Sequence, residues 1–397
     1  MASTLSGRKS VRTSYDGVAV TTPVTIPYER YSIQSAHWWI GRAVRALVDA
    51  SGISARDIDG FCLSSFTLGP DTAINLTQHL GLSVRWLDHI PLGGASAIAA
   101  LRRAARAVQA RDCDVVACVA ADTNHVDSFR HTLENFSRFS QDAVYPYGAG
   151  GANASFAMIM RHYMNRFGVK REDFGRIAVA QRANALRNPN ALMKTPLTLD
   201  QYMAARPISD PVHLYDCVMP CAGAEAFLVM REETAAAAGL KKATILGTIE
   251  RHNARLDDVV QSRGGWVEDI DDLYAMAALR PDKMDFLQTY DDYPVIVMMQ
   301  FEDLGFCAKG EGAAFVRQHD LTVDGTFPHN TSGGQLSVGQ AGAAGAYIGV
   351  TEALRQVMGT AGPTQEKGAR VGLASGFGMI NYERGLSSGA AIFAGEA

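Results

Sequence analysis

The residues of this chain best suited to covalent chemistry are its six cysteines, Cys62, Cys113, Cys118, Cys217, Cys221 and Cys307. A cysteine attacks a carbonyl or binds a metal as its thiolate, so its surroundings decide whether it reacts. Cys217 and Cys221 form a C-x3-C pair in the segment CVMPC, and no second pair accompanies them in the sequence. Because a structural zinc site takes four ligands, the sequence predicts no metal site.

A glycine-rich segment, SGGQLSVGQAG at 332–342, precedes a stretch of small and apolar residues at 343–358 that predicts a helix. Backbone N–H groups at the start of a helix can bind phosphate. The segment is not a P-loop, because no Gly-Lys-Ser/Thr follows its glycines. Tight turns and close packing are the alternative roles of Gly333, Gly334, Gly339, Gly342 and Gly345.

Alternating helices and apolar strands must position these residues, and this alternation predicts an α/β fold. The periodicity of apolar residues predicts helices at 36–51, 95–110, 156–167, 294–304 and 343–358. Short apolar runs predict strands at 60–65, 114–122, 224–230, 243–249, 369–379 and 389–395.

Two features of this order indicate how the chain is divided. A glycine turn, a small-residue helix and an apolar strand follow one another at 93–122 and again at 339–378, which indicates two related α/β halves. Between these repeats, the Pro-punctuated stretch 184–216 predicts a long excursion over the surface. Long irregular excursions in compact enzymes often bind substrate.

Composition and charge exclude several classes of protein. The 397 residues are 47% hydrophobic and 20% charged, which is typical of a globular protein with about two or three domains. The net charge is −4, the pI is near 6.2, and no basic run occurs, so no nucleic-acid partner is expected. Apolar stretches such as 294–301 are too short to span a membrane, and the polar N-terminus lacks the apolar core of a signal peptide. With its reduced thiols, the protein is expected in the cytoplasm.

The segment NTSGGQLSVGQAGAAG at 330–345 resembles the thiolase superfamily, whose members carry a GG-x-L-x-x-GHP-x-GA-x-G sequence near the reacting thioester. Four further segments match the family in the same order: SGISARDIDGF at 51–61, SFAMIMRHYMNRFGVKREDFG at 155–175, YDDYPVIVMMQFEDLGFCAKGEG at 290–312 and LASGFGM at 373–379. The segment at 290–312 resembles the sterol-carrier-protein-x and lipid-transfer-protein branch. The resemblance covers roughly residues 30–395.

This resemblance implies a thiolase fold, in which two βαβαβαββ halves form five layers, αβαβα, with an inserted loop domain. The N-terminal half is expected at 1–122 plus 222–250, the substrate-binding loop domain at 123–221 and the C-terminal half at 251–397. Proteins of this fold are usually homodimers. Members of this branch commonly bind a small accessory subunit that combines a zinc ribbon with an OB-fold, so a heterotetramer with such a subunit is expected.

The chain departs from the family at its three titratable positions. Thiolases attack with a cysteine at the start of the first small-residue helix, where the helix dipole favours the thiolate. In HIPLGGASAIAAL at 89–101, Ser96 matches the serine of the family's Cys-x-x-x-Ser pattern, which places Leu92 at the nucleophile position. The family's histidine falls at Gln340, and its second cysteine falls at Ala374, beside Ser375. Ping-pong thiolysis is therefore not expected.

A tyrosine indicates another chemistry. Tyr290 matches a tyrosine implicated in retro-aldol cleavage by steroid side-chain aldolases of the lipid-transfer branch, and a second tyrosine of that mechanism falls at Gln340. A retro-aldol step needs a base for the β-hydroxyl and stabilisation of the thioester enolate, but no nucleophile. Tyr290, Asp291, His329 and Gln340 meet these needs if they converge. Contacts with the CoA thioester are expected from Gly333, Gly334, Ser337, Ser375 and Gly376.

Each catalytic candidate also has a structural alternative. Tyr290 can be a packing residue at the end of a strand with its hydroxyl satisfied, and Asp291 can cap a turn or a helix. His329 can be an ordinary loop residue. Gln340 can cap the helix that follows it.

The sequence thus predicts an enzyme that makes or breaks a C–C bond next to the CoA thioester of a bulky acyl-CoA by aldol or retro-aldol chemistry. The thioester is its substrate, and no permanently bound cofactor is expected. One alternative is a β-ketoacyl-CoA thiolase whose nucleophile comes from another loop, as Cys217 or Cys221. The other alternative is a thiolase-fold scaffold without activity that organises a partner subunit.

Overall fold

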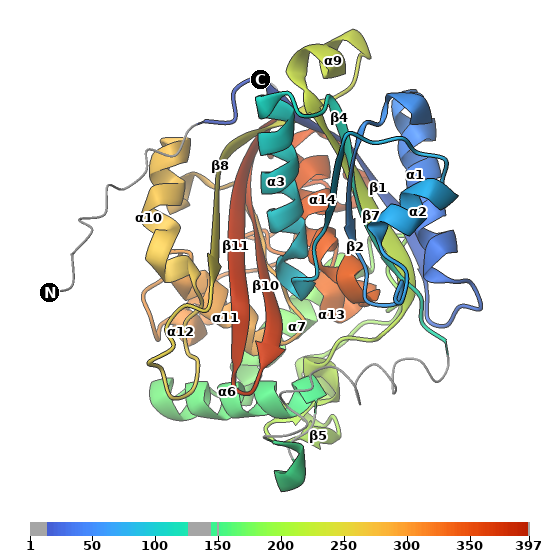
Figure 1. Cartoon of the computed structure of the whole chain (residues 1–397). Coiled ribbons are helices and arrows are strands. Elements are labelled where there is room, and N and C mark those ends of the chain that lie inside the picture. Colours follow the sequence, from blue (N-terminus) through green and yellow to red (C-terminus); the bar gives the residue numbers. More distant parts are fainter. Residues whose placement is uncertain (1–13, 126–143, 149–150, 396–397) are drawn as a thin grey trace, which may run out of the picture.

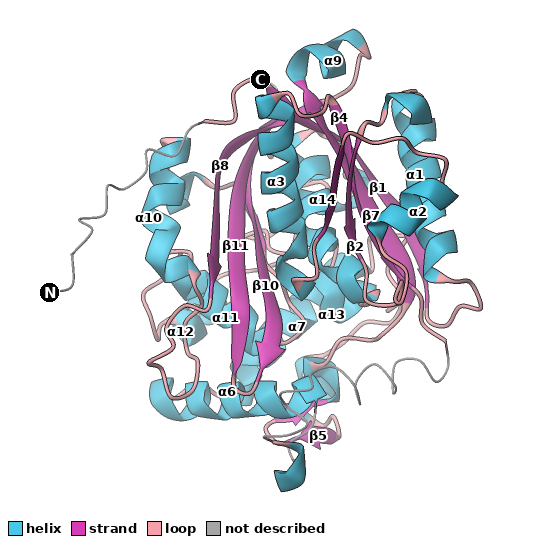
Figure 2. Ribbon diagram, in the orientation of Figure 1, coloured by secondary structure: helices cyan, strands magenta, loops and turns pink. Residues whose placement is uncertain are grey.

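The structure is a computed structural model that describes residues 14–125, 144–148 and 151–395. Nine strands form one large sheet: β1 (Val18–Glu29), β2 (Gly60–Ser64), β3 (Trp86–His89), β4 (Val115–Asp122), β7 (Ala222–Arg231), β8 (Lys242–His252), β9 (Phe286–Gln288), β10 (Val371–Asn381) and β11 (Arg384–Gly395). Their order is β3-β2-β4-β7-β1-β8-β11-β10-β9. Helices and strands alternate along the chain, which confirms the predicted α/β class (Figure 2).

The large sheet consists of two groups of strands with the same connectivity. β2 is parallel to β4, and β4, β7 and β1 follow as antiparallel neighbours. In the same way, β9 is parallel to β10, and β10, β11 and β8 follow as antiparallel neighbours. The two groups meet where β1 pairs with β8, at Val20↔Ala243 and Thr21↔Lys242. This repetition confirms the two related halves that the sequence predicts.

The helices complete five layers, as Figure 1 shows. α3 (Ser96–Ala110) and α14 (Gly345–Val357) lie between the two groups of strands and pack on both. α1 (Ala36–Ser51) and α2 (Ala73–His79) cover the outer face of the N-terminal group, and α10 (Trp266–Ala277) covers that of the C-terminal group. This order of layers confirms the predicted αβαβα arrangement.

Side-chain size explains which helices lie in the central layer. α3 buries six alanines, Ala97, Ala99, Ala100, Ala104, Ala105 and Ala107. These small side chains let the helix approach a sheet on each side at the close packing of a protein interior. α1 instead has one buried face, which includes Trp39, Ile40 and Leu47. The Ser35 side chain caps α1, and Gly52 ends it with a φ of 69°.

The chain between β4 and β7 packs across one end of the sheets. Its described part contains α6 (Gly151–Phe167), α7 (Arg171–Ala185), α8 (Leu199–Met203) and a hairpin of β5 (Pro207–Ser209) with β6 (Val212–His213). Figure 1 shows α6 and β5 at the lower end of the sheets. α7 contacts α11 (Pro294–Asp303), α12 (Gly312–Gln318) and α13 (Gly334–Val338) of the C-terminal half. This region therefore encloses the end of the sheets where the site residues gather.

The limits of the three predicted regions remain a proposal. We propose that the boundary between the halves lies before β8 rather than at residue 250, because β8 pairs with β11 along nine residue pairs. The predicted loop domain at 123–221 includes residues 126–143 and 149–150, which lie outside the described residues.

Candidate active site

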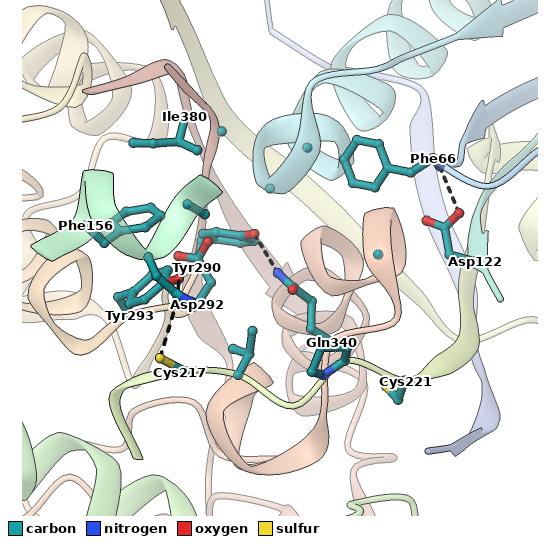
Figure 3. A pocket seen from close by; sticks show the side chains of 18 of the residues that line it. Phe66, Asp122, Phe156, Cys217, Cys221, Tyr290, Asp292, Tyr293, Gln340 and Ile380 are labelled. Atoms are coloured by element: carbon teal, nitrogen blue, oxygen red, sulfur yellow. Dashed lines mark hydrogen bonds between the residues drawn. The ribbon is translucent and has the colours of Figure 1, made fainter. Parts of the chain in front are cut away.

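A cavity of about 380 Å³ lies where the two halves meet the region between β4 and β7 (Figure 3). Its walls come from the start of α3, α6, the segment before β7, the turns before α11 and α14, and the end of β10. Most of the lining is apolar and includes Phe66, Phe156, Ile208, Leu214, Val218, Phe377, Met379 and Ile380. Its polar residues include Asp122, Asn153, Arg206, Cys217, Cys221, Tyr290, Asp292, Tyr293 and Gln340.

Tyr290 follows β9 and lines the cavity. Gln300 of α11 fixes its backbone, because Gln300 Nε2 donates to the Tyr290 carbonyl at 2.7 Å and Gln300 Oε1 accepts from the Tyr290 N–H at 3.3 Å. Ser375 Oγ donates to the same Oε1 at 2.7 Å. The ring lies so close to Gly94 that a Cβ added there would be 2.2 Å from ring atoms. The present position of the Tyr290 ring therefore requires glycine at position 94.

Gln340 lies on the turn before α14 and reaches the same cavity. The segment before β7 holds its backbone, since the Gln340 N–H donates to the Met219 carbonyl at 2.8 Å and the Cys221 N–H donates to the Gln340 carbonyl at 3.0 Å. Gln340 Nε2 donates to Tyr290 Oη at 3.3 Å, as the dashed line in Figure 3 shows. The structure thus brings together two of the four predicted catalytic residues.

The protonation state of Tyr290 determines what this pair can do. Burial raises the pKa of Tyr290 well above 10, and the carboxyls of Asp292 and Asp291 raise it further, while the hydrogen bond from Gln340 opposes the rise. The phenol is therefore neutral near pH 7. Its oxygen accepts from Gln340, and its hydroxyl also hydrogen-bonds to the Asp292 carboxyl, so a ligand oxygen in the cavity would share or replace the contact with Asp292. Tyr290 and Gln340 together form a pair of donors for an oxygen that gains negative charge.

Asp291 and His329 do not line this cavity. The Asp291 carboxylate accepts from the backbone N–H groups of Gln335 and Leu336 at 2.9 and 3.2 Å and so holds the start of α13. Burial raises the pKa of Asp291 to about 7, although these hydrogen bonds oppose the rise. His329 is fully buried, its Nε2 lies 2.8 Å from Thr289 Oγ1, and burial lowers its pKa to about 3. Neither side chain therefore has direct access to a molecule in the cavity.

The three glycines expected to contact the thioester permit close packing in this structure. Gly333 and Gly334 have φ angles of 104° and 57°, which favour glycine. A Cβ on Gly334 would lie 2.1 Å from the Asp291 carboxylate, and one on Gly376 would lie 2.7 Å from the Gly94 carbonyl oxygen. These glycines are not among the residues that line the cavity, so their contact with CoA remains a prediction.

The two serines expected to contact the thioester bond to other side chains. Ser337 Oγ accepts from Arg182 Nε at 3.1 Å. Ser375 Oγ donates to Gln300, as described above, and thereby supports the backbone of Tyr290. A role for either serine in binding CoA also remains a prediction.

The cavity contains two thiols, although neither lies at a position expected from the family. Leu92 is not among the residues that line the cavity, and Ala374 is fully buried in β10. Cys217 and Cys221 line the cavity from the segment before β7 (Figure 3). Burial raises the pKa of Cys217 to about 12, with a further rise from Asp216 and Asp292, and burial also raises the pKa of Cys221. Both are therefore thiols, not thiolates, near pH 7.

Asp292 is a polar residue of the cavity that the sequence does not single out. Its Oδ1 atom is buried and has no hydrogen-bond partner among the described residues. Burial raises its pKa well above 3.8, the charge of Asp291 adds to the rise, and a hydrogen bond from Tyr290 opposes it. The doubled acid in TYDDYP was the available signal, but a sequence does not show which of two adjacent carboxyls faces a cavity.

Asp122 connects the two halves beside the cavity. Its Oδ1 accepts from the N–H groups of Phe66 and Thr67 at 2.8 and 2.7 Å and from the Ser65 hydroxyl at 2.9 Å. Its Oδ2 accepts from the N–H of Ala343, in the turn before α14, at 2.7 Å. Burial raises the pKa of Asp122, and these hydrogen bonds oppose the rise. Because both of its oxygens accept hydrogen bonds, the Asp122 side chain holds in place the turn that carries Gln340.

In the ranges 14–125, 144–148 and 151–395, no group of three or more His, Cys, Asp or Glu side chains is arranged to hold a metal ion. No helix in these ranges is both long enough and apolar enough to cross a membrane.

A duplicated five-layer α/β fold with a site at the start of its central helices defines the class of protein, and comparison with known proteins agrees. The family model "Thiolase C-terminal domain-like" matches residues 256–387. The steroid side-chain-cleaving aldolase of Thermomonospora curvata is 31% identical over 80% of this chain and 84% of that protein. The 17-hydroxy-3-oxo-4-pregnene-20-carboxyl-CoA lyase of Mycobacterium tuberculosis is 31% identical over 80% of this chain and 86% of that protein.

Among solved structures, the Ltp2-ChsH2(DUF35) aldolase superposes with a TM-score of 0.82 at 27% identity and covers 96% of this chain and 98% of that chain. This chain belongs to the thiolase superfamily, in its sterol-carrier-protein-x and lipid-transfer-protein branch. It is an enzyme of that superfamily, which includes both lyases and acyltransferases.

Proposed function

We propose that this chain cleaves, or in reverse forms, the C–C bond next to the thioester of an acyl-CoA by aldol chemistry. The observation that carries the proposal is the pair Tyr290 and Gln340, two neutral donors 3.3 Å apart in the cavity. A thiolase requires a thiolate and a histidine near the thioester, whereas this chain has Leu92 and Gln340 at those positions. The aldolase and CoA lyase among its relatives support the same reaction class.

The cleavage direction shows what the pair contributes. Removal of the β-hydroxyl proton breaks the bond between the α and β carbons, and the bonding electrons move onto the thioester as an enolate. The β carbon leaves as a carbonyl product, and protonation of the α carbon gives a shorter acyl-CoA. Tyr290 and Gln340 donate hydrogen bonds to the thioester oxygen while it gains charge. One preorganised donor of this kind typically contributes about 10²–10³ in kcat.

The lining of the cavity supports a bulky, polycyclic acyl group. Phe156 and Tyr293 stack with ring centroids 4.0 Å apart, and Phe377 lies 6.5 Å from Phe156 by the same measure. Rigid apolar walls of this kind favour a rigid apolar ligand, because little side-chain entropy is lost on binding. The names of two relatives describe a steroid side chain and a pregnene-20-carboxyl-CoA. We therefore propose a steroid-like β-hydroxyacyl-CoA as substrate, with no permanently bound cofactor.

The assembly belongs to this proposal as well. We propose that the chain forms a homodimer and binds an accessory subunit with a zinc ribbon and an OB-fold, to give a heterotetramer in the cytoplasm. The name of the Ltp2-ChsH2(DUF35) aldolase, which contains a second component, supports a partner of this kind. Co-expression with a candidate subunit, followed by measurement of the mass of the complex, tests the assembly.

A second candidate reaction rests on the thiols in the cavity. Cys217 and Cys221 both line it, so a displaced cysteine can meet a thioester there without a change in fold. The raised pKa of each thiol opposes this reaction, since neither has a nearby positive charge that outweighs the effect of burial. Thiolytic cleavage of a β-ketoacyl-CoA is therefore the less favoured function.

The dependence on free CoA distinguishes the two reactions. The purified complex is incubated with 17-hydroxy-3-oxo-4-pregnene-20-carboxyl-CoA, with and without free CoA, and the carbonyl product and the shortened acyl-CoA are quantified by mass spectrometry. Aldol cleavage gives both products in equal amounts without free CoA. Turnover of acyl-CoA substrates that strictly requires free CoA would contradict the proposal and support thiolysis.

A further inference from the structure

The proposed reaction needs a base, and the donor pair does not supply one. Tyr290 is a neutral phenol because its pKa is raised, and the Gln340 amide does not titrate near pH 7. His329 lies behind the cavity with Nε2 against Thr289, and Asp291 binds the backbone at the start of α13. The β-hydroxyl proton must therefore go to another group in the cavity.

Asp292 has the geometry that this step requires. It lines the cavity between Tyr290 and Tyr293, at the turn before α11 (Figure 3). Its Oδ1 has no hydrogen-bond partner among residues 14–125, 144–148 and 151–395, although the atom is buried. A buried carboxylate oxygen without a partner is costly, because nothing replaces the water that it lost. A bound ligand hydroxyl would supply the missing donor.

The other carboxyls around the cavity are already bonded. Asp122 accepts hydrogen bonds from both halves through its two oxygens. Asp216 accepts from Tyr202 and from the His213 N–H. Asp291 accepts from two backbone N–H groups. The Asp292 carboxyl also hydrogen-bonds to the Tyr290 hydroxyl and to the backbone N–H groups of Asp292 and Tyr293, but its Oδ1 has no partner among the described residues and remains available to the substrate.

We propose that Asp292 is the general base of the reaction: it takes the proton from the β-hydroxyl of the substrate and returns it to the α carbon of the enolate. This inference rests on the proposed function. The O–H bond breaks as the carboxyl gains its proton, and the Cα–Cβ electrons become the enolate held by Tyr290 and Gln340. The α carbon then takes the proton back. The carboxylate is regenerated, and no further reactant is consumed.

The charges around Asp292 are suited to a base. The titratable groups that interact with it include Tyr290, Asp291, Tyr293 and Cys217, and the cation Arg206 lines the same cavity and acts on Cys217. Burial together with Asp291 raises the pKa of Asp292 well above that of an ordinary carboxyl, although the hydrogen bond from Tyr290 opposes the rise. A general base works best when its pKa lies near the pH at which the enzyme operates, and the raised pKa of Asp292 lies nearer to that pH than the pKa of an ordinary carboxyl does.

The test measures the rate at which the wild-type complex and its D292N and D292E variants cleave the probe 17-hydroxy-3-oxo-4-pregnene-20-carboxyl-CoA. D292N is expected to lose about 10²–10⁴ in kcat, the usual contribution of a general base, with KM changed much less. The wild-type rate should rise with pH along a limb that D292N lacks. D57N is the matched control, because Asp57 is an exposed acid that does not line the cavity. It should behave as the wild type.

The outcomes separate this inference from the proposed function. If the wild type does not cleave the probe, the proposed function is wrong. If the wild type cleaves it and D292N does so at an equal rate, only the role of Asp292 is refuted. Affinity for the shortened acyl-CoA, measured by calorimetry, shows whether D292N is folded. If it is not, D292E decides: a reduced rate that keeps the pH limb supports the inference, and an unchanged rate refutes it.

Discussion

Replacing Tyr290 by phenylalanine tests the donor pair most directly. The change removes the hydroxyl that accepts from Gln340 at 3.3 Å and leaves the ring, its contact with Gly94 and the bonds of its backbone to Gln300 in place. Tyr290→Phe should therefore lower kcat about 10²–10³-fold, or about 2.7–4 kcal/mol of transition-state stabilisation. KM should change less, because the thioester oxygen carries little charge before the bond breaks.

The stability of the Tyr290→Phe variant should change little. One hydrogen bond is lost, which corresponds to about 1 kcal/mol. In a chain of this length, that loss lowers the melting temperature by about 1 °C. Scanning calorimetry and initial rates on the same preparation therefore separate a loss of chemistry from a loss of fold.

Tyr293→Phe is the control for this experiment. The Tyr293 hydroxyl lies in the same wall of the cavity but donates to Asn153 Oδ1 at 2.5 Å. Its removal should cost less than about tenfold in kcat, since that hydroxyl is already engaged. Equal losses in the two variants, or a loss in Tyr290→Phe confined to KM, would refute the role assigned to Tyr290.

Three further predictions concern the surroundings of the pair. Folding raises the pKa of Asp291 to about 7, so the stability of the folded protein should fall as pH rises from about 4 to 7 and the buried carboxyl loses its proton. Asparagine does not titrate, so urea titrations should show Asp291→Asn gaining stability relative to the wild type over this range. Gly94→Ala places a Cβ 2.2 Å from the Tyr290 ring and should lower the free energy of unfolding by about 1–3 kcal/mol and reduce the cleavage rate. Gly41→Ala is the control, because its Cβ would lie 3.5 Å from the nearest atom, and it should change neither quantity. Iodoacetamide should label Cys217 and Cys221 slowly near pH 7.5, because both thiols have raised pKa values. A variant with serine at both positions should still cleave the substrate. Rapid labelling of one thiol with loss of turnover would favour thiolysis instead.

Most of the fold could be predicted from the sequence, and the exceptions have identifiable causes. The apolar runs and glycine turns identify the central helices and the long strands, because burial on both faces leaves a continuous apolar pattern. The strand β1 lacks that signal, since Pro23 and Pro27 interrupt it. The structure accommodates both prolines where the register with β7 shifts, between Thr21 and Val24 and between Ile26 and Glu29.

The candidate site could be predicted only in part. Tyr290 and Gln340 follow from the resemblance to a family, and the structure places them together. The positions of Asp291 and Asp292 depend on which way each side chain of a turn points, which no periodicity reveals. The exclusion of His329 from the cavity depends on packing against Phe301, 4.8 Å away between ring centroids, from a helix remote in the sequence.

The bonds of Asp122 determine which mutations the junction between the halves tolerates. Three of its four donors named above are main-chain N–H groups, at Phe66, Thr67 and Ala343. Any residue except proline supplies such a donor, so substitutions at Phe66 and Ala343 keep these bonds, whereas a substitution at Thr67 also removes its hydroxyl, which donates to Asp122 Oδ1 at 2.6 Å. A single inserted or deleted residue in either loop instead moves the donors off the carboxylate. The lengths of these two loops therefore constrain the junction as directly as the side chains that they carry.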